Sequence, residues 1–237
     1  MVTKILTIIV LSILIIVLLI FTSMLQYIIK AINKNTIEKV GQYNLLNKNA
    51  KPNQIVFLGD SLTEFFATSE FFDCLIYNRG IAGDDTIGVL KRLHDNVIKI
   101  NPKMIFLQIG TNDLGKNKKA NYVYSNIKTI LLELKDNLPN CKLFYISLYP
   151  VNSKAIIYSK LVTGKRKNKD IIQINNLMKG FCVEEYIEYI DIYSHLVDND
   201  GNLNKEYTIE GLHINFEGYL IIYNVLKHYL MDENKIL

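Results

Sequence analysis

Residues 54–63 read QIVFLGDSLT, and this stretch indicates both the fold class and the chemistry. Gln54–Leu58 is a short apolar run rich in β-branched and aromatic residues, which is typical of a buried β-strand. The run leads directly into the turn-forming pair Gly59-Asp60 and then into Ser61, where a short helical pattern begins. This order of strand, turn and helix is expected at the start of an α/β unit.

Further along the chain, short apolar runs alternate with longer helical patterns. The other predicted strands are Leu75–Tyr77, Met104–Ile109, Leu143–Leu148 and Glu188–Ile192. Apolar residues at helical spacing recur in residues 87–98, 127–134, 171–178 and 220–226. This alternation predicts an α/β fold, with a parallel sheet covered on both faces by helices. In such sheets, functional groups gather outside the carboxyl ends of the strands.

Polar groups suited to acyl transfer follow three of the predicted strands. Ser61 stands where a helix N-terminus can expose its hydroxyl, and Gly83 can bring its N–H close to a ligand because it has no side chain. Asn112, within the run Gly110–Asp113, offers a side-chain donor of the kind that stabilises an oxyanion. Each motif alone also fits an ordinary turn, and Asp84 is expected to cap the following helix.

One of the four histidines stands out as a candidate base. His213 precedes the last helical pattern, and Glu210 lies three residues before it. A nucleophilic serine needs a base of near-neutral pKa and a group that holds the base in one tautomer, and a single loop can supply both. His94 and His228 fall within helical patterns, whereas His195 has no carboxylate at comparable spacing.

Four short sequence blocks together resemble those of a known family. Gly59–Leu62 (GDSL), Gly83, Gly110–Asp113 (GTND) and Glu210–His213 resemble, in this order and at these separations, the blocks of the SGNH, or GDSL-type, hydrolases. The resemblance covers residues 53–230. NRGIAGDDT at residues 78–86 and GLHINFEGY at residues 211–219 are similar to the branch that contains the platelet-activating-factor acetylhydrolase catalytic subunits and many bacterial acyl esterases.

The resemblance implies a flavodoxin-like three-layer α/β/α sandwich and a specific set of site residues. Ser61 would be the nucleophile and His213 the base, and the Ser61 N–H, the Gly83 N–H and the Asn112 side chain would form the oxyanion hole. No metal or cofactor is implied. The family usually has Asp where this chain has Glu210, so either Glu210 or a backbone carbonyl orients the His213 ring.

The N-terminus predicts a membrane anchor. Residues 5–29 contain no charged side chain, and this run exceeds the roughly 20 residues that cross a bilayer. A signal peptide has a shorter apolar region and a small-x-small cleavage site, so an uncleaved anchor over residues 1–29 is favoured. Residues 30–50 then form a polar spacer, and residues 51–237 form the catalytic domain. Lysines behind the anchor favour a cytoplasmic body, whereas the resemblance favours the extracytoplasmic side.

The charge distribution argues against nucleic-acid binding, and the cysteines argue against a disulfide framework or a zinc site. The chain has 27 basic and 23 acidic residues, but the surplus lies within residues 1–50, and the remainder is balanced. A neutral body lacks the basic face that nucleic-acid binding requires. Three scattered cysteines predict neither a disulfide framework nor a zinc site, and are expected to be small buried hydrophobes. Asp198–Gly201 is interpreted as a turn, because the other ligands of a Ca²⁺ loop are missing.

These observations predict a membrane-anchored serine esterase that acts on small acyl esters, such as O-acetylated carbohydrate or a lysolipid. The alternatives are a non-catalytic binding protein with the same fold, suggested by the unusual Glu210, and an O-acyltransferase with the same nucleophile. Residues 149–169 carry six basic residues, among them Lys160, Lys165, Arg166, Lys167 and Lys169, and form either a lid over the site or a solvated basic loop. The expected partners are the ester substrate and the membrane, and the oligomeric state stays open.

Overall fold

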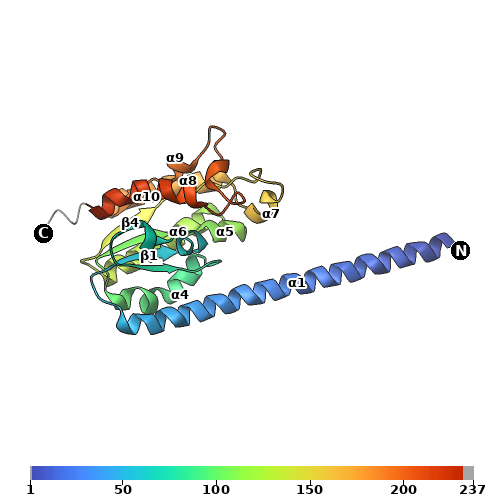
Figure 1. Ribbon diagram of the computed structural model, residues 1–237, viewed down its shortest axis with the longest axis horizontal. Helices are drawn as coiled ribbons and strands as arrows, with labels where there is room; N and C mark the ends of the chain where they lie inside the picture. Colours follow the sequence, from blue (N-terminus) through green and yellow to red (C-terminus); the bar gives the residue numbers. More distant parts are fainter. Residues whose placement is uncertain (1, 232–237) are drawn as a thin grey trace.

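A parallel sheet of five strands lies in the middle of the structure, a computed structural model that describes residues 2–231 (Figure 1). The strand order is β2-β1-β3-β4-β5, which is the flavodoxin-like order. The strands are β1 (Ile55–Gly59), β2 (Ile76–Gly80), β3 (Met104–Gln108), β4 (Lys142–Ile146) and β5 (Glu188–Ile190). All five predicted strands are present, which confirms the α/β prediction.

Helices cover both faces of the sheet, because side chains of each strand alternate between two apolar cores. In β1, Val56 and Leu58 face one core and Ile55 and Phe57 face the other. The first core is closed by α4 (Thr86–Asn96), α6 (Ala120–Asn137) and α8 (Asn168–Glu184). The second is closed by α2 (Ser61–Glu64), α3 (Thr68–Phe71), α9 (Tyr193–Leu196) and α10 (Phe216–Met231).

An aromatic stack runs across the strands in the second core. Phe57, Phe106 and Phe144 occupy matching positions of β1, β3 and β4, so parallel pairing places their rings side by side. The ring centroids are 4.8 Å apart for Phe57 and Phe106, and 4.3 Å apart for Phe106 and Phe144. Each such pair adds about 1 kcal/mol beyond burial, so the stack reinforces the strand register.

Short elements complete the chain. They are η1 (Asn47–Asn49), η2 (Ile98–Ile100), α5 (Thr111–Gly115), α7 (Ser159–Thr163) and η3 (Lys205–Tyr207). The expectation of three buried cysteines was wrong for two of them: Cys182 is buried inside α8, but Cys141 is half-buried and Cys74 is exposed. Cys74 lies just before β2 and Cys141 just before β4. All three thiols are free.

The N-terminal helix α1 (Val2–Leu46) projects far beyond the α/β body (Figure 1). Its segment Lys4–Met24 is long and apolar enough to cross a membrane, with a mean hydropathy of 3.3, and none of it is buried. An anchor and a signal sequence both meet this criterion. The helix continues through most of the predicted spacer and ends against the α/β body.

Polar contacts hold the C-terminal end of α1 on the body. The Tyr43 hydroxyl donates to the Gly80 carbonyl oxygen at 2.8 Å. Asn47 Oδ1 accepts from Arg79 Nη2 at 2.7 Å, and the Arg79 guanidinium lies 4.8 Å from the centre of the Tyr43 ring. Arg79 is only 4% exposed, so Tyr43 of α1 and Asn47, which directly follows α1, supply partners to a buried charge. The predicted domain boundary at residue 51 stays a prediction, and these contacts give it a test.

We expect Asn47→Ala to lower the free energy of unfolding by about 1–3 kcal/mol, because it leaves a buried guanidinium with a missing partner. The melting temperature of the full chain in detergent should then fall by roughly 2–4 °C for each kcal/mol lost. Lys34→Ala is the matched control, because the Lys34 side chain is 76% exposed. A chain that begins at residue 51 should be less stable than either variant; equal stability would support the predicted boundary.

Candidate active site

The turn after β1 places Ser61 at the N-terminus of α2. Asp60 precedes the helix and accepts a hydrogen bond from the Leu62 N–H at 2.9 Å, which caps the first turn. Gly59 has no room for a side chain, because a Cβ there would lie 2.3 Å from the Gln108 carbonyl oxygen. The chain therefore turns sharply at the sheet edge and presents the Ser61 hydroxyl beyond the strand.

His213 and Glu210 lie beside this serine. Ser61 Oγ is 3.2 Å from His213 Nε2, and His213 Nδ1 is 2.5 Å from Glu210 Oε1. The same carboxylate oxygen accepts the His213 backbone N–H at 3.1 Å. Glu210 is only 6% exposed, whereas the His213 side chain is 29% exposed, as a base that must reach a substrate should be. The structure thus brings together the three side chains singled out in the sequence.

The loop that carries the acid and base is internally braced. Thr208 Oγ1 donates to the His213 carbonyl oxygen at 2.7 Å and accepts the Gly211 N–H at 2.8 Å. Gly211 has a φ of 97°, and a Cβ there would lie 2.0 Å from the Asn152 carbonyl oxygen. Only glycine fits both the conformation and the close approach, so this loop is held against the segment that follows β4.

The three predicted oxyanion donors are the Ser61 N–H, the Gly83 N–H and the Asn112 side chain. Gly83 has a φ of 82°, and within residues 2–231 neither the Ser61 N–H nor the Gly83 N–H has an acceptor. Asn112 Nδ2 donates to the Asp84 carbonyl oxygen at 2.8 Å and lies 3.4 Å from Asp60 Oδ2. Two N–H groups without an acceptor and an oriented side-chain amide are the groups that the predicted oxyanion hole requires.

Arg166 fixes the Asn112 amide, and sequence reasoning missed it. Arg166 Nη2 donates to Asn112 Oδ1 at 2.7 Å, while Nε donates to the Thr111 carbonyl oxygen at 2.9 Å. A guanidinium can only donate, so the amide oxygen must face Arg166 and the amide nitrogen must face the site. The guanidinium lies over Gly115, where a Cβ would be 2.6 Å from Cζ. Arg166 lies among five lysines in residues 149–169, so the sequence gave no signal of this role.

Asp84 has a different role from the one expected. The N-cap of α4 is Asp85, which accepts the Gly88 N–H at 2.9 Å, so the prediction that Asp84 caps this helix was wrong. Asp84 is buried and pairs with Arg92 Nε at 2.7 Å, because a buried carboxylate needs a compensating charge. Arg92 Nη2 also donates to the Gly59 carbonyl oxygen at 3.1 Å, which links the Gly83 loop to the serine turn.

Burial perturbs the charged groups around Ser61. Burial raises the pKa of Asp60 to about 7, although the Leu62 N–H and the nearby Arg166 charge lower it. Burial also raises the pKa of Asp84, and the charge of Arg92 opposes this shift. The pKa of Arg166 is lowered by burial, with Asp60 acting against the change. Asp60 therefore changes charge near neutral pH beside the serine.

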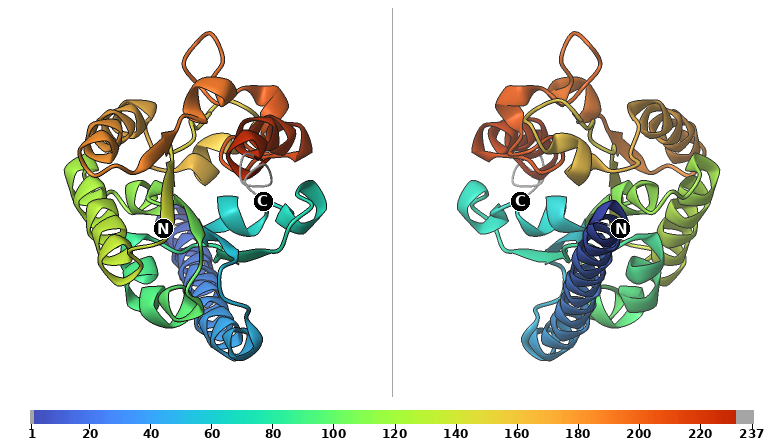
Figure 2. Two further views of the ribbon diagram at one scale, coloured as in Figure 1. Left: turned by 90° about the vertical axis from the view of Figure 1, so that its left-hand side faces the viewer. Right: turned by 90° about the vertical axis from the view of Figure 1, so that its right-hand side faces the viewer.

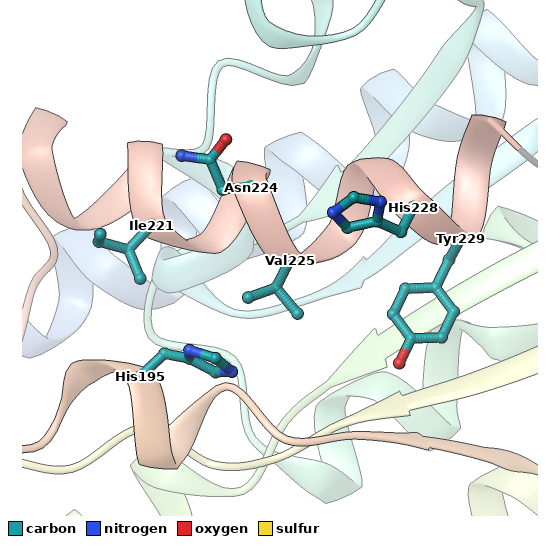
Figure 3. Close-up of a pocket in the computed structure, with 6 residues that line it drawn as sticks. All are labelled: His195, Ile221, Asn224, Val225, His228 and Tyr229. Carbon is teal, nitrogen blue, oxygen red and sulfur yellow. The ribbon is translucent and has the colours of Figure 1, made fainter.

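The remaining histidines lie elsewhere. A cavity of about 450 Å³ between α9 and α10 is lined by His195, Ile221, Asn224, Val225, His228 and Tyr229 (Figure 3). These six lining residues include no carboxylate and no serine or cysteine, so the cavity lacks the groups for acyl transfer. His94 is exposed on α4 and contacts its neighbour Asp95.

No metal-binding cluster of three or more His, Cys, Asp or Glu side chains occurs in the part of the chain that the structure describes. The segment Asp198–Gly201 is a turn, as predicted. Asp198 Oδ1 accepts the N–H groups of Asp200 at 3.0 Å and Asn202 at 2.8 Å. This carboxylate oxygen therefore braces the turn itself.

Comparison with known proteins gives consistent results. The model of the GDSL-like lipase/acylhydrolase family matches residues 57–221. A Streptococcus pneumoniae structure provisionally described as a platelet activating factor is 30% identical, with a TM-score of 0.80, over 87% of this chain and 97% of that one. A GDSL-like lipase from Bacteroides thetaiotaomicron is 25% identical, with a TM-score of 0.72, over 82% and 98% of the two chains.

Curated relatives add a second similarity. An N-acylneuraminate cytidylyltransferase from Escherichia coli is 27% identical over 202 residues, which is 81% of this chain and 45% of that protein. A protein of the same name from Streptococcus agalactiae is 26% identical over 192 residues, or 81% of this chain and 41% of its own length. This chain therefore spans less than half the length of these relatives.

The raised pKa of Asp60 predicts a specific pH dependence of stability. Between about pH 4 and pH 7 the folded state keeps the Asp60 proton while the unfolded state has lost it, so stability should fall as pH rises through this window. The slope from this group is at most about 1.4 kcal/mol per pH unit. Urea unfolding at several pH values should show this slope in the wild type and lose it in Asp60→Asn, because the amide does not titrate. Parallel curves for the two proteins would contradict the assignment to Asp60.

Proposed function

The chain belongs to the GDSL-like lipase/acylhydrolase family, a family of ester-hydrolysing enzymes, and we propose that it is a membrane-anchored serine esterase that acts on small acyl esters. The observation that carries the proposal is the unbroken contact from Ser61 Oγ through the His213 ring to Glu210. This arrangement supplies a nucleophile, a base and an orienting acid on one sheet edge.

The geometry supports a two-step acyl transfer. Glu210 Oε1 accepts a hydrogen bond from the protonated Nδ1 of His213. This leaves Nε2 free to take the proton from Ser61 Oγ as the oxygen attacks the ester carbonyl. His213 then returns this proton to the departing alcohol. Water attacks the resulting acyl-enzyme, again with His213 as base, and releases the carboxylic acid and free Ser61.

The developing oxyanion needs donors that act only when the tetrahedral state forms. The Ser61 and Gly83 N–H groups are two such donors, and Asn112 Nδ2 is the third. Asn112 keeps its 2.8 Å bond to the Asp84 carbonyl oxygen, while the 3.4 Å contact to Asp60 is long enough to be replaced by the oxyanion. Arg166 holds the amide in this orientation throughout.

We infer that the substrates are esters of carbohydrate or lysolipid. We also infer that α1 anchors the enzyme in a membrane. The apolar segment Lys4–Met24 supports the anchor through its length and hydropathy. The curated relatives are named for N-acylneuraminate, an acyl sugar, and this similarity supports carbohydrate esters within the proposed range. The side of the membrane on which the body lies is not assigned.

Removal of the nucleophile is the direct test. Ser61→Ala should lower kcat for p-nitrophenyl acetate by at least about 1000-fold and abolish labelling by a fluorophosphonate probe. Glu210→Gln should lower kcat by about 100-fold or more, because the base loses its orienting charge. Ser194→Ala is the matched control, since Ser194 is an exposed serine on α9. Normal turnover or labelling in Ser61→Ala would overturn the assignment.

Arg166 is expected to act as a positioning residue. Arg166→Met should lower kcat by about 10- to 100-fold with KM changed less than about twofold, since one misaligned oxyanion donor accounts for up to about 1000-fold. Arg166→Lys should not restore the rate, because an ammonium lacks the planar fork that bridges Thr111 and Asn112. Gly115→Ala should show a weaker form of the same defect by displacing the guanidinium.

Lys167→Met removes an exposed neighbouring charge and serves as the control for Arg166→Met. Steady-state kinetics with p-nitrophenyl acetate at several concentrations separates kcat from KM. A loss confined to KM, or an equal loss in Lys167→Met, would contradict a role of Arg166 in holding Asn112.

A further inference from the structure

Contacts between α1 and the α/β body fix the direction of α1 relative to the active site. The helix runs without a break from Val2 to Leu46 and contains no proline. Besides Tyr43 and Asn47, Lys39 forms an ion pair with Glu64 on α2. The membrane-spanning segment proposed above therefore leaves the body in one direction.

The site edge of the sheet faces the membrane end of this helix. The strands run so that their carboxyl ends, followed by α5 and α7, lie on the side of the body toward the N-terminus of α1 (Figure 1). The view along α1 from its N-terminus looks onto this same edge (Figure 2, right). A bilayer that α1 crosses is therefore on the side to which the active site opens.

Exposed apolar side chains gather on this edge. Ile157 is 99% exposed and Leu161 on α7 is 84% exposed. Phe65, which lies 5.5 Å from the His213 ring, is 51% exposed, and Ile209 and Phe216 on either side of the catalytic loop are 60% and 64% exposed. Leaving large apolar side chains in water is unfavourable, and such clusters mark surfaces that contact a partner or a membrane.

The base of the α7 segment is firmly held although its tip is exposed. Ser159 is buried, its Oγ accepts the Ile156 N–H at 2.7 Å, and it packs against Gly211 of the catalytic loop. Thr163 Oγ1 donates to the Ser159 carbonyl oxygen at 2.9 Å. Ile157 and Leu161 are thus presented outward by a fixed support next to the active site.

Charge on the same segment favours an anionic surface. Residues 153–169 contain no acidic side chain, and apart from the half-buried Arg166 their basic residues are exposed: Lys154, Lys160, Lys165, Lys167 and Lys169. Lysines close to an anionic membrane surface are attracted to it. Apolar side chains flanked by lysines are typical of segments that lie in the membrane interface.

We propose that the α7 surface, defined as Ile157 and Leu161 with Lys154, Lys160 and Lys165, contacts the anionic lipid surface of the bilayer that α1 crosses. The active site then acts on acyl esters presented at that surface. This proposal rests on the proposed esterase function for its chemistry and on the proposed anchor for its geometry. Insertion of Ile157 and Leu161 would remove their apolar surface from water, which favours contact with the membrane.

The chain contains no tryptophan, so one introduced indole reports on membrane contact directly. The full-length Ile157→Trp variant is reconstituted in phosphatidylcholine vesicles containing phosphatidylglycerol. Its emission should shift to the blue and be quenched by brominated phosphatidylcholine. Val183→Trp is the control, because Val183 is 74% exposed at the end of α8, before β5 begins at the opposite sheet edge. An unquenched Ile157→Trp overturns the proposal.

A blue shift without bromine quenching that grows with protein concentration also overturns the proposal, because a second copy of the chain would then cover this surface. The fluorescence readout does not depend on catalysis. It therefore decides membrane contact even if Ser61→Ala were to keep its activity and the proposed function were to fail.

Kinetics tests the consequence for the substrate. Ile157→Ser combined with Leu161→Ser should lower hydrolysis of vesicle-borne p-nitrophenyl palmitate about tenfold or more, and change hydrolysis of soluble p-nitrophenyl acetate less than about twofold. Val183→Ser combined with Tyr186→Ser is the matched control, since Tyr186 is 96% exposed next to Val183. An unchanged ratio of the two rates, with Ser61→Ala inactive, overturns this inference and leaves the esterase proposal standing.

Discussion

The buried ion pair between Asp84 and Arg92 ties together the strand ends that build the site. Arg92 also holds the Gly59 carbonyl oxygen after β1, and the Asp84 carbonyl oxygen accepts Asn112 after β3. Removing one partner of such a pair costs about 3–5 kcal/mol, because an uncompensated charge stays buried. The serine turn, the Gly83 loop and the Asn112 amide are therefore linked through this ion pair, while Arg166 sets the direction of the amide.

Local sequence was enough to predict the strands and the residues that meet at the site. The runs that became β1 and β3 are uniformly apolar, as buried parallel strands are, and the turns that follow carry Ser61 and Asn112. The roles of Arg92 and Arg166 were not predictable in this way. Their site partners, Gly59 and Asn112, lie far away in the sequence, and neither burial of a guanidinium nor the direction of an amide leaves a periodic pattern.

The packing of the C-terminal part of α1 on the α/β body was also not predictable from the sequence. Its composition, rich in Asn and Lys, predicts a solvated spacer, because hydrophobic periodicity is the main sequence signal for a packed helix. The helix packs through hydrogen bonds instead: Tyr43 to Gly80, Asn44 Oδ1 from Asn96 at 2.7 Å, and Asn47 to Arg79. A polar contact face is indistinguishable in sequence from a solvated one, so only the structure reveals it.

This packing bears on what the proposed anchor would do for the enzyme. Glu64 pairs with Lys39 of α1 and also accepts the Ala82 N–H at 2.5 Å, next to Gly83 of the proposed oxyanion hole. Fifteen residues separate Met24 from Lys39, a span of about 22 Å in a helix, and a flexible linker of that length would reach about the same distance on average. The reach is equal, but a linker samples every orientation whereas a packed helix keeps one. If α1 is the proposed anchor, it therefore determines the orientation of the site more than the distance of the site from the bilayer.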